Sequence, residues 1–103
     1  MFRRKRFGEL IKMQLDVFAI DHADRLMSLH TALEEYRASD REEAEERYGD
    51  YADEIDWAAE ELAEMRDAYA ATLDPELVEQ YEREFSKMVH KVYPPIAVIL
   101  DTL

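Results

Sequence analysis

The sequence predicts an all-α protein: a long antiparallel helical hairpin plus a shorter third helix, completing a helical bundle by dimerisation. Few positions interrupt a helix, because the 103 residues include only two glycines and three prolines. Hydrophobic residues make up 48% of the chain and charged residues 37%, and the hydrophobic ones recur at intervals of three and four. A chain of this length and pattern is expected to form one domain with a modest core.

The first helix is expected over residues 7–38, after a basic arm at residues 1–6. Its main apolar stripe consists of Ile11, Leu15, Phe18, His22, Leu26, Leu29, Leu33 and Tyr36. A second stripe keeps the same spacing on a neighbouring face and consists of Leu10, Met13, Val17, Ile20 and Met27. The second stripe is interrupted at Asp24, so the first half of this helix is apolar on two sides.

The second helix is expected over residues 40–73. Ser39 and Glu42 have the spacing of a capping box, in which each side chain accepts a hydrogen bond from the other residue's backbone amide. Gly49 lies inside the helical pattern, and its cost of about 1 kcal/mol relative to alanine is tolerable, so we expect one continuous helix. The apolar stripe consists of Tyr48, Tyr51, Ile55, Ala58, Leu62, Met65 and Tyr69.

The third helix is expected over residues 75–93. Asp74 followed by Pro75 reads as an N-cap residue and a proline at the first helical position. Pro94 and Pro95 end the helix, because the residue before a proline is pushed out of helical geometry. Residues 94–103 form an apolar tail. The third helix has an apolar face made of Leu77, Tyr81, Phe85, Met88, Val89 and Val92.

The helix lengths predict which part of the hairpin is covered. The third helix is about 28 Å long at 1.5 Å per residue, so it can cover only the half of the hairpin near the chain termini. That half is where the 7–38 helix has two apolar faces. The distal half then lacks a cover over Leu29, Leu33, Tyr36, Tyr48 and Tyr51. The candidates for this cover are the tail, a second copy and a foreign partner with a basic or apolar surface; we expect a homodimer.

Charge is unevenly distributed along the chain. Arg3, Arg4, Lys5 and Arg6 stand at the head of a chain with a net charge of −12. Removing these four from the 13 basic residues leaves nine against 25 acids, a net −16 for the rest. Contact of the arm with a membrane surface or with nucleic acid is disfavoured, because the acidic remainder is repelled by both. We therefore expect the arm to bind an acidic helix face in its own bundle or in a neighbouring copy.

His22 is the candidate for a metal ligand. Asp53, Glu54 and Asp56 of the second helix are expected at its level, and histidine with carboxylates suits a ferritin-like metal centre. The Glu-x-x-His spacing typical of such centres is absent from the sequence. A histidine hydrogen-bonded to a neighbour in the bundle is the simpler interpretation, and we expect neither a metal nor a cofactor.

Trp57 is the candidate anchor for a partner. It shares a helix side with acidic residues, away from the apolar stripe, and could therefore bind a partner that brings cations. The alternative is that Trp57 packs under the third helix, under the tail or against a second copy.

Catalytic motifs are missing from the sequence. Cysteine is absent, the three serines lie in no nucleophile-elbow context, and two glycines cannot form a phosphate-binding loop. The sequence therefore predicts a small acidic cytoplasmic protein, not an enzyme, that acts as a non-catalytic protein–protein interaction or self-assembly module. The first alternative is a metal-binding, ferritin-like helical bundle, and the second is a peripheral adaptor on an anionic surface.

Overall fold

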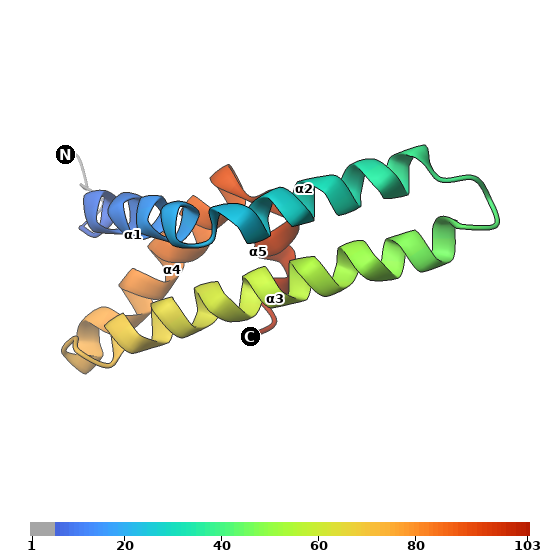
Figure 1. Ribbon diagram of the computed structural model, residues 1–103. Helices are drawn as coiled ribbons and strands as arrows, with labels where there is room; N and C mark the ends of the chain where they lie inside the picture. Colours follow the sequence, from blue (N-terminus) through green and yellow to red (C-terminus); the bar gives the residue numbers. More distant parts are fainter. Residues whose placement is uncertain (1–5) are drawn as a thin grey trace.

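The computed structural model describes residues 6–103, and this part of the chain is an elongated bundle of five helices without strands (Figure 1). The bundle measures 53 × 25 × 24 Å. Its helices are α1 (Gly8–Asp21), α2 (Ala23–Ala38), α3 (Ala44–Ala70), α4 (Pro75–Val92) and α5 (Pro94–Leu100). The predicted all-α class is therefore confirmed. Within residues 6–103, no helix has both the length and the apolar character needed to cross a membrane.

The single helix expected over residues 7–38 is two helices that meet at His22. His22 has φ −119° and ψ 27°, outside helical geometry, so α1 and α2 bend relative to each other (Figure 1). The bend lets α1 pack against α4 while α2 packs against α3. The histidine ring lies 5.2 Å from both Phe18 and Trp57, measured between ring centroids. We attribute the break to this packing, because the local sequence contains no glycine or proline.

The turn between α2 and α3 is capped by Asp40, so the predicted capping box is wrong. Asp40 Oδ1 accepts hydrogen bonds from the backbone amides of Glu42 and Glu43, both at 3.0 Å. The Ser39 hydroxyl instead donates back to the carbonyl oxygen of Tyr36 at 2.6 Å. Regular α3 begins at Ala44, four residues later than expected, and continues without interruption through Gly49.

Helix α4 begins at Pro75, as the sequence predicts, and its cap differs in detail. The Asp74 side chain makes no capping hydrogen bond, and the Asp74 carbonyl oxygen accepts from the Leu77 amide at 2.9 Å. Tyr93 ends the helix with φ −133° and ψ 65°, an extended φ that suits a residue before proline. The expected stop at the two prolines is therefore observed.

The apolar tail at residues 94–103 contains a fifth helix. Pro94 and Pro95 occupy the first positions of α5, where their missing amide donors cost no helical hydrogen bond. Ile96, Ala97 and Leu100 are each at most 2% exposed, and α5 packs against α3 and α4. The tail is therefore part of the hydrophobic core.

The core lies in the half of the molecule near the termini. Helix α2 contributes no fully buried side chain, whereas α1, α3, α4 and α5 all do. Tyr81 of α4 is completely buried, and its hydroxyl donates a 3.0 Å hydrogen bond to Gln14 Oε1 of α1. Burial raises the pKa of the Tyr81 hydroxyl to about 12. The remaining length of α2 and α3 extends beyond this core as a pair of neighbouring helices (Figure 1).

Candidate interaction surface

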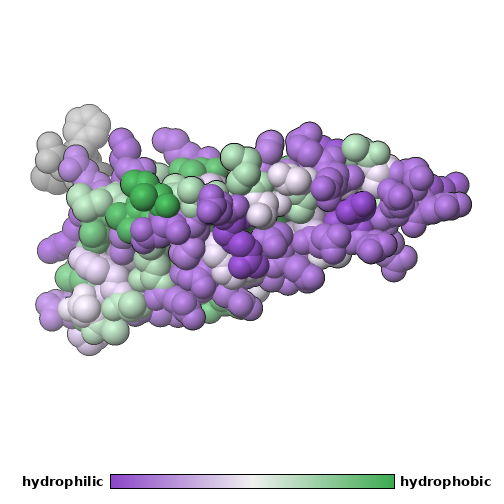
Figure 2. Space-filling view, in the orientation of Figure 1, coloured by the Kyte–Doolittle hydropathy of each residue, from purple (hydrophilic) through white to green (hydrophobic). Residues whose placement is uncertain are grey.

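The most exposed apolar residues of α1 lie on the face opposite the core. Met13 is 63% exposed, Val17 44% and Ile20 76%, and Met27 of α2 continues the pattern at 66%. Figure 2 shows hydrophobic surface over α1 in a molecule that is otherwise largely hydrophilic on this side. We call these four residues the outer stripe. They belong to the second apolar stripe of the sequence, which we expected the third helix to cover; α4 packs on the other side of α1 and leaves them exposed.

Carboxylates flank the outer stripe. Glu9, Asp16 and Asp21 are exposed beside the stripe, and Asp24 is exposed within its spacing, between Ile20 and Met27. Apolar surface bordered by charged groups is typical of a protein-binding surface, because the border keeps the unbound protein soluble and restricts which partners fit. An anionic lipid surface is a poor match, since these carboxylates would be brought against it.

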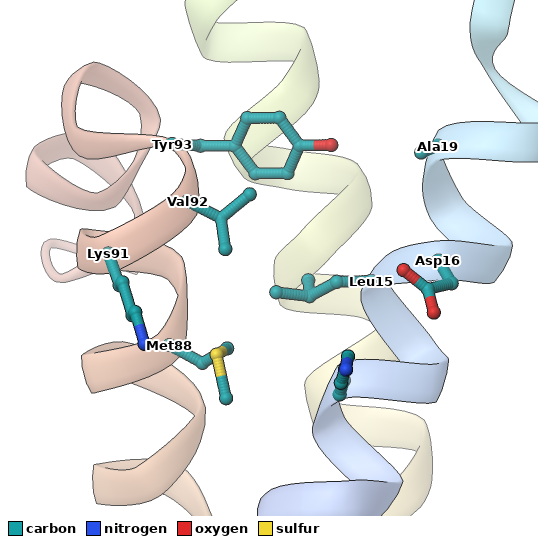
Figure 3. A pocket seen from close by; sticks show the side chains of 8 residues that line it. Leu15, Asp16, Ala19, Met88, Lys91, Val92 and Tyr93 are labelled. Carbon is teal, nitrogen blue, oxygen red and sulfur yellow. The ribbon is translucent and has the colours of Figure 1, made fainter.

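A groove of about 360 Å³ lies between α1 and α4, beside the outer stripe. Figure 3 shows Leu15 and Met88 pointing into the space between the two helices, with the Tyr93 ring closing one end. Burial raises the pKa of the Tyr93 hydroxyl, and the nearby Asp16 carboxylate acts in the same direction. Lys12 from α1 and Lys91 from α4 add two ammonium groups to the lining, which also includes the Asp16 carboxylate. The groove can accept an apolar side chain of a partner whose acidic groups reach the two ammonium groups.

Three lysines line the groove and the hollow next to it, and the sequence did not predict that they lie close together. The chain has only four lysines, at positions 5, 12, 87 and 91. Lys87 lines a smaller hollow that shares Met88 and Lys91 with the groove. Every ion pair within residues 6–103 uses an arginine or a histidine, so none uses one of these lysines. The clustering of lysines near the two ends of the sequence was the available signal.

Trp57 already has its aromatic and cationic neighbours within the chain. Its ring stacks on Phe18 at a centroid distance of 6.3 Å, and the guanidinium carbon of Arg25 lies 4.4 Å from its centroid. Arg25 also donates a 2.8 Å hydrogen bond from Nε to Glu54. Trp57 is half-buried and joins α3 to α1 and α2. Its role in binding a partner stays a prediction.

The distal residues named by the sequence lie between α2 and α3. Leu29, Leu33 and Tyr36 are half-buried, and the Tyr36 ring meets Tyr48 at 5.3 Å. Tyr48 stays 53% exposed. Tyr48, Tyr51 and Ile55 line a shallow hollow together with Pro95, Val98 and Ile99 of α5.

The α5 tail therefore reaches one edge of the distal region. Tyr51 is half-buried and packs against the core, and burial raises the pKa of its hydroxyl. Arg47 and Glu35 add an ion pair of 3.2 Å across the two helices. The distal residues thus have intramolecular neighbours, whereas the outer stripe is the more exposed apolar surface.

Of the basic arm, Arg3, Arg4 and Lys5 lie outside the described residues. Arg6 is exposed. The point at which the chain enters α1 is defined, because the Phe7 amide donates a 3.0 Å hydrogen bond to Glu84 Oε1 of α4. The expected contact between the arm and an acidic helix face stays a prediction.

His22 lies beside one carboxylate and two aromatic rings. Its Nε2 is 3.9 Å from Glu61 Oε2, a residue further along α3 than the carboxylates we expected at this level. Within residues 6–103, no three histidine, aspartate or glutamate side chains come together as a set that could hold a metal ion. The contacts of His22 are those of a residue that packs the bend between α1 and α2.

A serine, a histidine and an aspartate meet where the C-terminus packs on α4. Ser86 Oγ donates a 2.7 Å hydrogen bond to Asp101 Oδ1, and His90 Nε2 lies 2.6 Å from Asp101 Oδ2. The His90 hydrogen bond, with help from Ser86, lowers the pKa of the Asp101 carboxyl. In a hydrolase triad the histidine stands between the serine and the carboxylate; here the carboxylate is central. The serine therefore has no adjacent base, and the cluster fastens the chain end to α4.

Comparison with protein-family models, with curated proteins and with solved structures finds no match to this chain.

Proposed function

We propose that this protein is a non-catalytic protein–protein interaction module that self-associates. In this proposal the hairpin of α2 and α3 and the shorter helices form a scaffold, and a second copy completes the helical bundle. The absence of cysteine suits a reducing compartment, and we place the protein in the cytoplasm.

One observation carries the proposal: the fold leaves the outer stripe exposed although the same chain buries a complete core. Burying a large aliphatic side chain stabilises a protein by roughly 1.5–3 kcal/mol, so Met13, Ile20 and Met27 gain this stabilisation only from a partner. Two-fold dimers are the commonest homo-oligomers of soluble proteins, so a second copy is the partner we propose.

The polar groups of the structure support a non-catalytic role. The Ser86–Asp101–His90 cluster lacks the order that activates a serine, and His22 is occupied with packing at the bend. The groove between α1 and α4 is open and mainly apolar, which suits the side chain of a partner.

Sedimentation velocity of the purified protein tests the proposal. We expect the average mass to rise from that of the 12.2 kDa monomer towards twice that value as concentration increases from low micromolar to several hundred micromolar. A mass that stays at the monomer value over this range would contradict self-association. Loss of α-helical circular dichroism at low concentration would show that association and folding are coupled.

A further inference from the structure

We propose that the second copy docks on the outer face of α1 in an antiparallel, two-fold arrangement, with Val17 of each copy against Ile20 of the other. This inference rests on the proposed self-association and specifies its surface, its orientation and its register.

The spacing of the outer stripe is that of a coiled-coil seam. Within α1, Leu10, Met13, Val17 and Ile20 follow one another at intervals of three, four and three, with Leu10 half-buried and the other three exposed. Asp24 and Met27 continue the spacing at intervals of four and three in α2, beyond the bend at His22. Apolar residues at this spacing pack another helix by inserting into gaps between four facing side chains. Five of the six positions are apolar. Asp24 is the single polar position, and a polar residue in such a seam selects orientation and register.

Charge rules out the parallel arrangement. Parallel helices in register would place Asp24 against Asp24 of the second copy, at the α2 end of the stripe. At the edges they would bring Asp16 close to Asp21 of the second copy. Both contacts oppose like charges in a partly desolvated interface, which is unfavourable.

The antiparallel arrangement avoids both contacts. With Val17 opposite Ile20 of the second copy, Asp24 at the start of α2 lies opposite Met13 of the second copy. Residues on the same edge of antiparallel helices face each other, so Asp16 lies opposite Ala23 of the second copy. On the other edge Asp21 lies opposite Gln14. No carboxylate of this stretch then faces another, and the surface is complementary to itself, as a two-fold contact requires.

A pair of single-site variants tests the surface. Ile20 and Val98 are 76% and 60% exposed, on α1 and α5 respectively, so a charge at either position leaves the fold intact. We expect Ile20→Glu to weaken self-association by about tenfold or more, because the charge enters an apolar seam, and Val98→Glu to have no effect. Circular dichroism confirms that both variants are folded.

The outcomes separate this inference from the proposed function. If the wild type and the Ile20→Glu variant associate equally well, the proposed self-association stands and the α1 interface is overturned. A wild-type protein that is monomeric at every concentration would overturn both. Weakening by Val98→Glu and not by Ile20→Glu would assign the interface to α5 and would overturn the inference.

Mixing two variants tests orientation and register. Val17→Lys and Ile20→Glu are each expected to be monomeric where the wild type is dimeric. In the antiparallel register, a mixed dimer places the introduced lysine opposite the introduced glutamate and keeps the other layer apolar. We therefore expect the mixture to dimerise. In a parallel dimer position 17 faces position 17, so a mixture that stays monomeric would overturn the antiparallel arrangement.

Salt dependence tests the identity of the partner. Two copies with a net charge of −12 each repel one another, so screening by salt favours their association. We expect the dissociation constant to fall as NaCl rises from roughly 0.05 M to 0.5 M. A dissociation constant that rises with salt would indicate contacts between opposite charges and would overturn an interface that depends on the apolar seam.

Discussion

The two faces of α1 have the same apolar chemistry and opposite environments. Ile11 on the inner face is completely buried in the hydrophobic core, whereas Ile20 on the outer face is 76% exposed. Phe18 and Met13 repeat this contrast at 1% and 63%. The same helical spacing produces both faces, so spacing alone identifies an apolar face and does not identify what covers it.

The difference matters for energetics as well as for function. The inner face contributes to the free energy of folding of a single chain, because its side chains leave water when the monomer folds. The outer face contributes no comparable stabilisation until a second protein surface binds to it. The two faces should therefore respond differently to the same substitution.

The largest effect is expected on the inner face. Ile11→Ala removes buried side-chain volume at a position with 0% exposure and should lower the free energy of unfolding by about 3 kcal/mol, within a range of roughly 2–5 kcal/mol. Urea denaturation followed by circular dichroism measures this loss. A loss below about 1 kcal/mol would show that the inner face is not the packed side of α1.

The contrast also shows how far sequence reasoning extends. Both stripes of α1 could be found from the sequence, because residue type and spacing are local properties. Which stripe is buried depends on which side of α1 packs against α4 once the chain bends at His22. The bend depends on contacts with Phe18 and Trp57, and Trp57 is 35 residues away in the sequence. Long-range packing of this kind has no local signal.

Two other differences have equally specific causes. Ser39 and Asp40 both belong to the residue types that cap helices, and only the backbone geometry of the turn decides that Asp40 accepts the hydrogen bonds. Helix α5 has seven residues and begins with two prolines, too short for a periodic pattern to appear. The residues of the outer stripe could be identified as an apolar stripe from the sequence. Their exposure could not be predicted from it.

The second prediction concerns Gly49. Substitution there changes the local helix propensity without changing any side-chain packing. Gly49 is an exposed interior position of α3, and a Cβ atom added there would meet nothing within 4 Å. Gly49→Ala should therefore raise the free energy of unfolding by about 0.5–1 kcal/mol. Thermal denaturation measures the gain. A decrease in melting temperature would show that this region of α3 is not a regular helix.

The third prediction concerns Asp101, which follows α5 and binds Ser86 and His90 of α4. These contacts hold α5 against the core that also contains the inner face of α1. Asp101 has a pKa below its ordinary value of 3.8, so its contribution to stability is present above that value and is lost as pH falls through the lower folded-state pKa. The side chain is partly exposed, so Asp101→Asn should cost less than about 1 kcal/mol at pH 6. The difference between wild type and variant should shrink as pH falls below 3.8 and be lost as pH passes through the lower folded-state pKa. A difference that grows on acidification would contradict the pairing with His90.

The smallest effect is expected on the outer face and completes the matched pair with Ile11. Ile20→Ala deletes the same atoms from the same helix, at a position where water already contacts most of the side chain. At a concentration where the protein is monomeric, the free energy of unfolding should change by less than about 0.5 kcal/mol. At a concentration where it is dimeric, the variant should lose stability through weaker association, since binding to the folded state adds to its apparent stability. An equal loss at both concentrations would mean that the monomer itself covers Ile20, and the distinction between the two faces of α1 would fail.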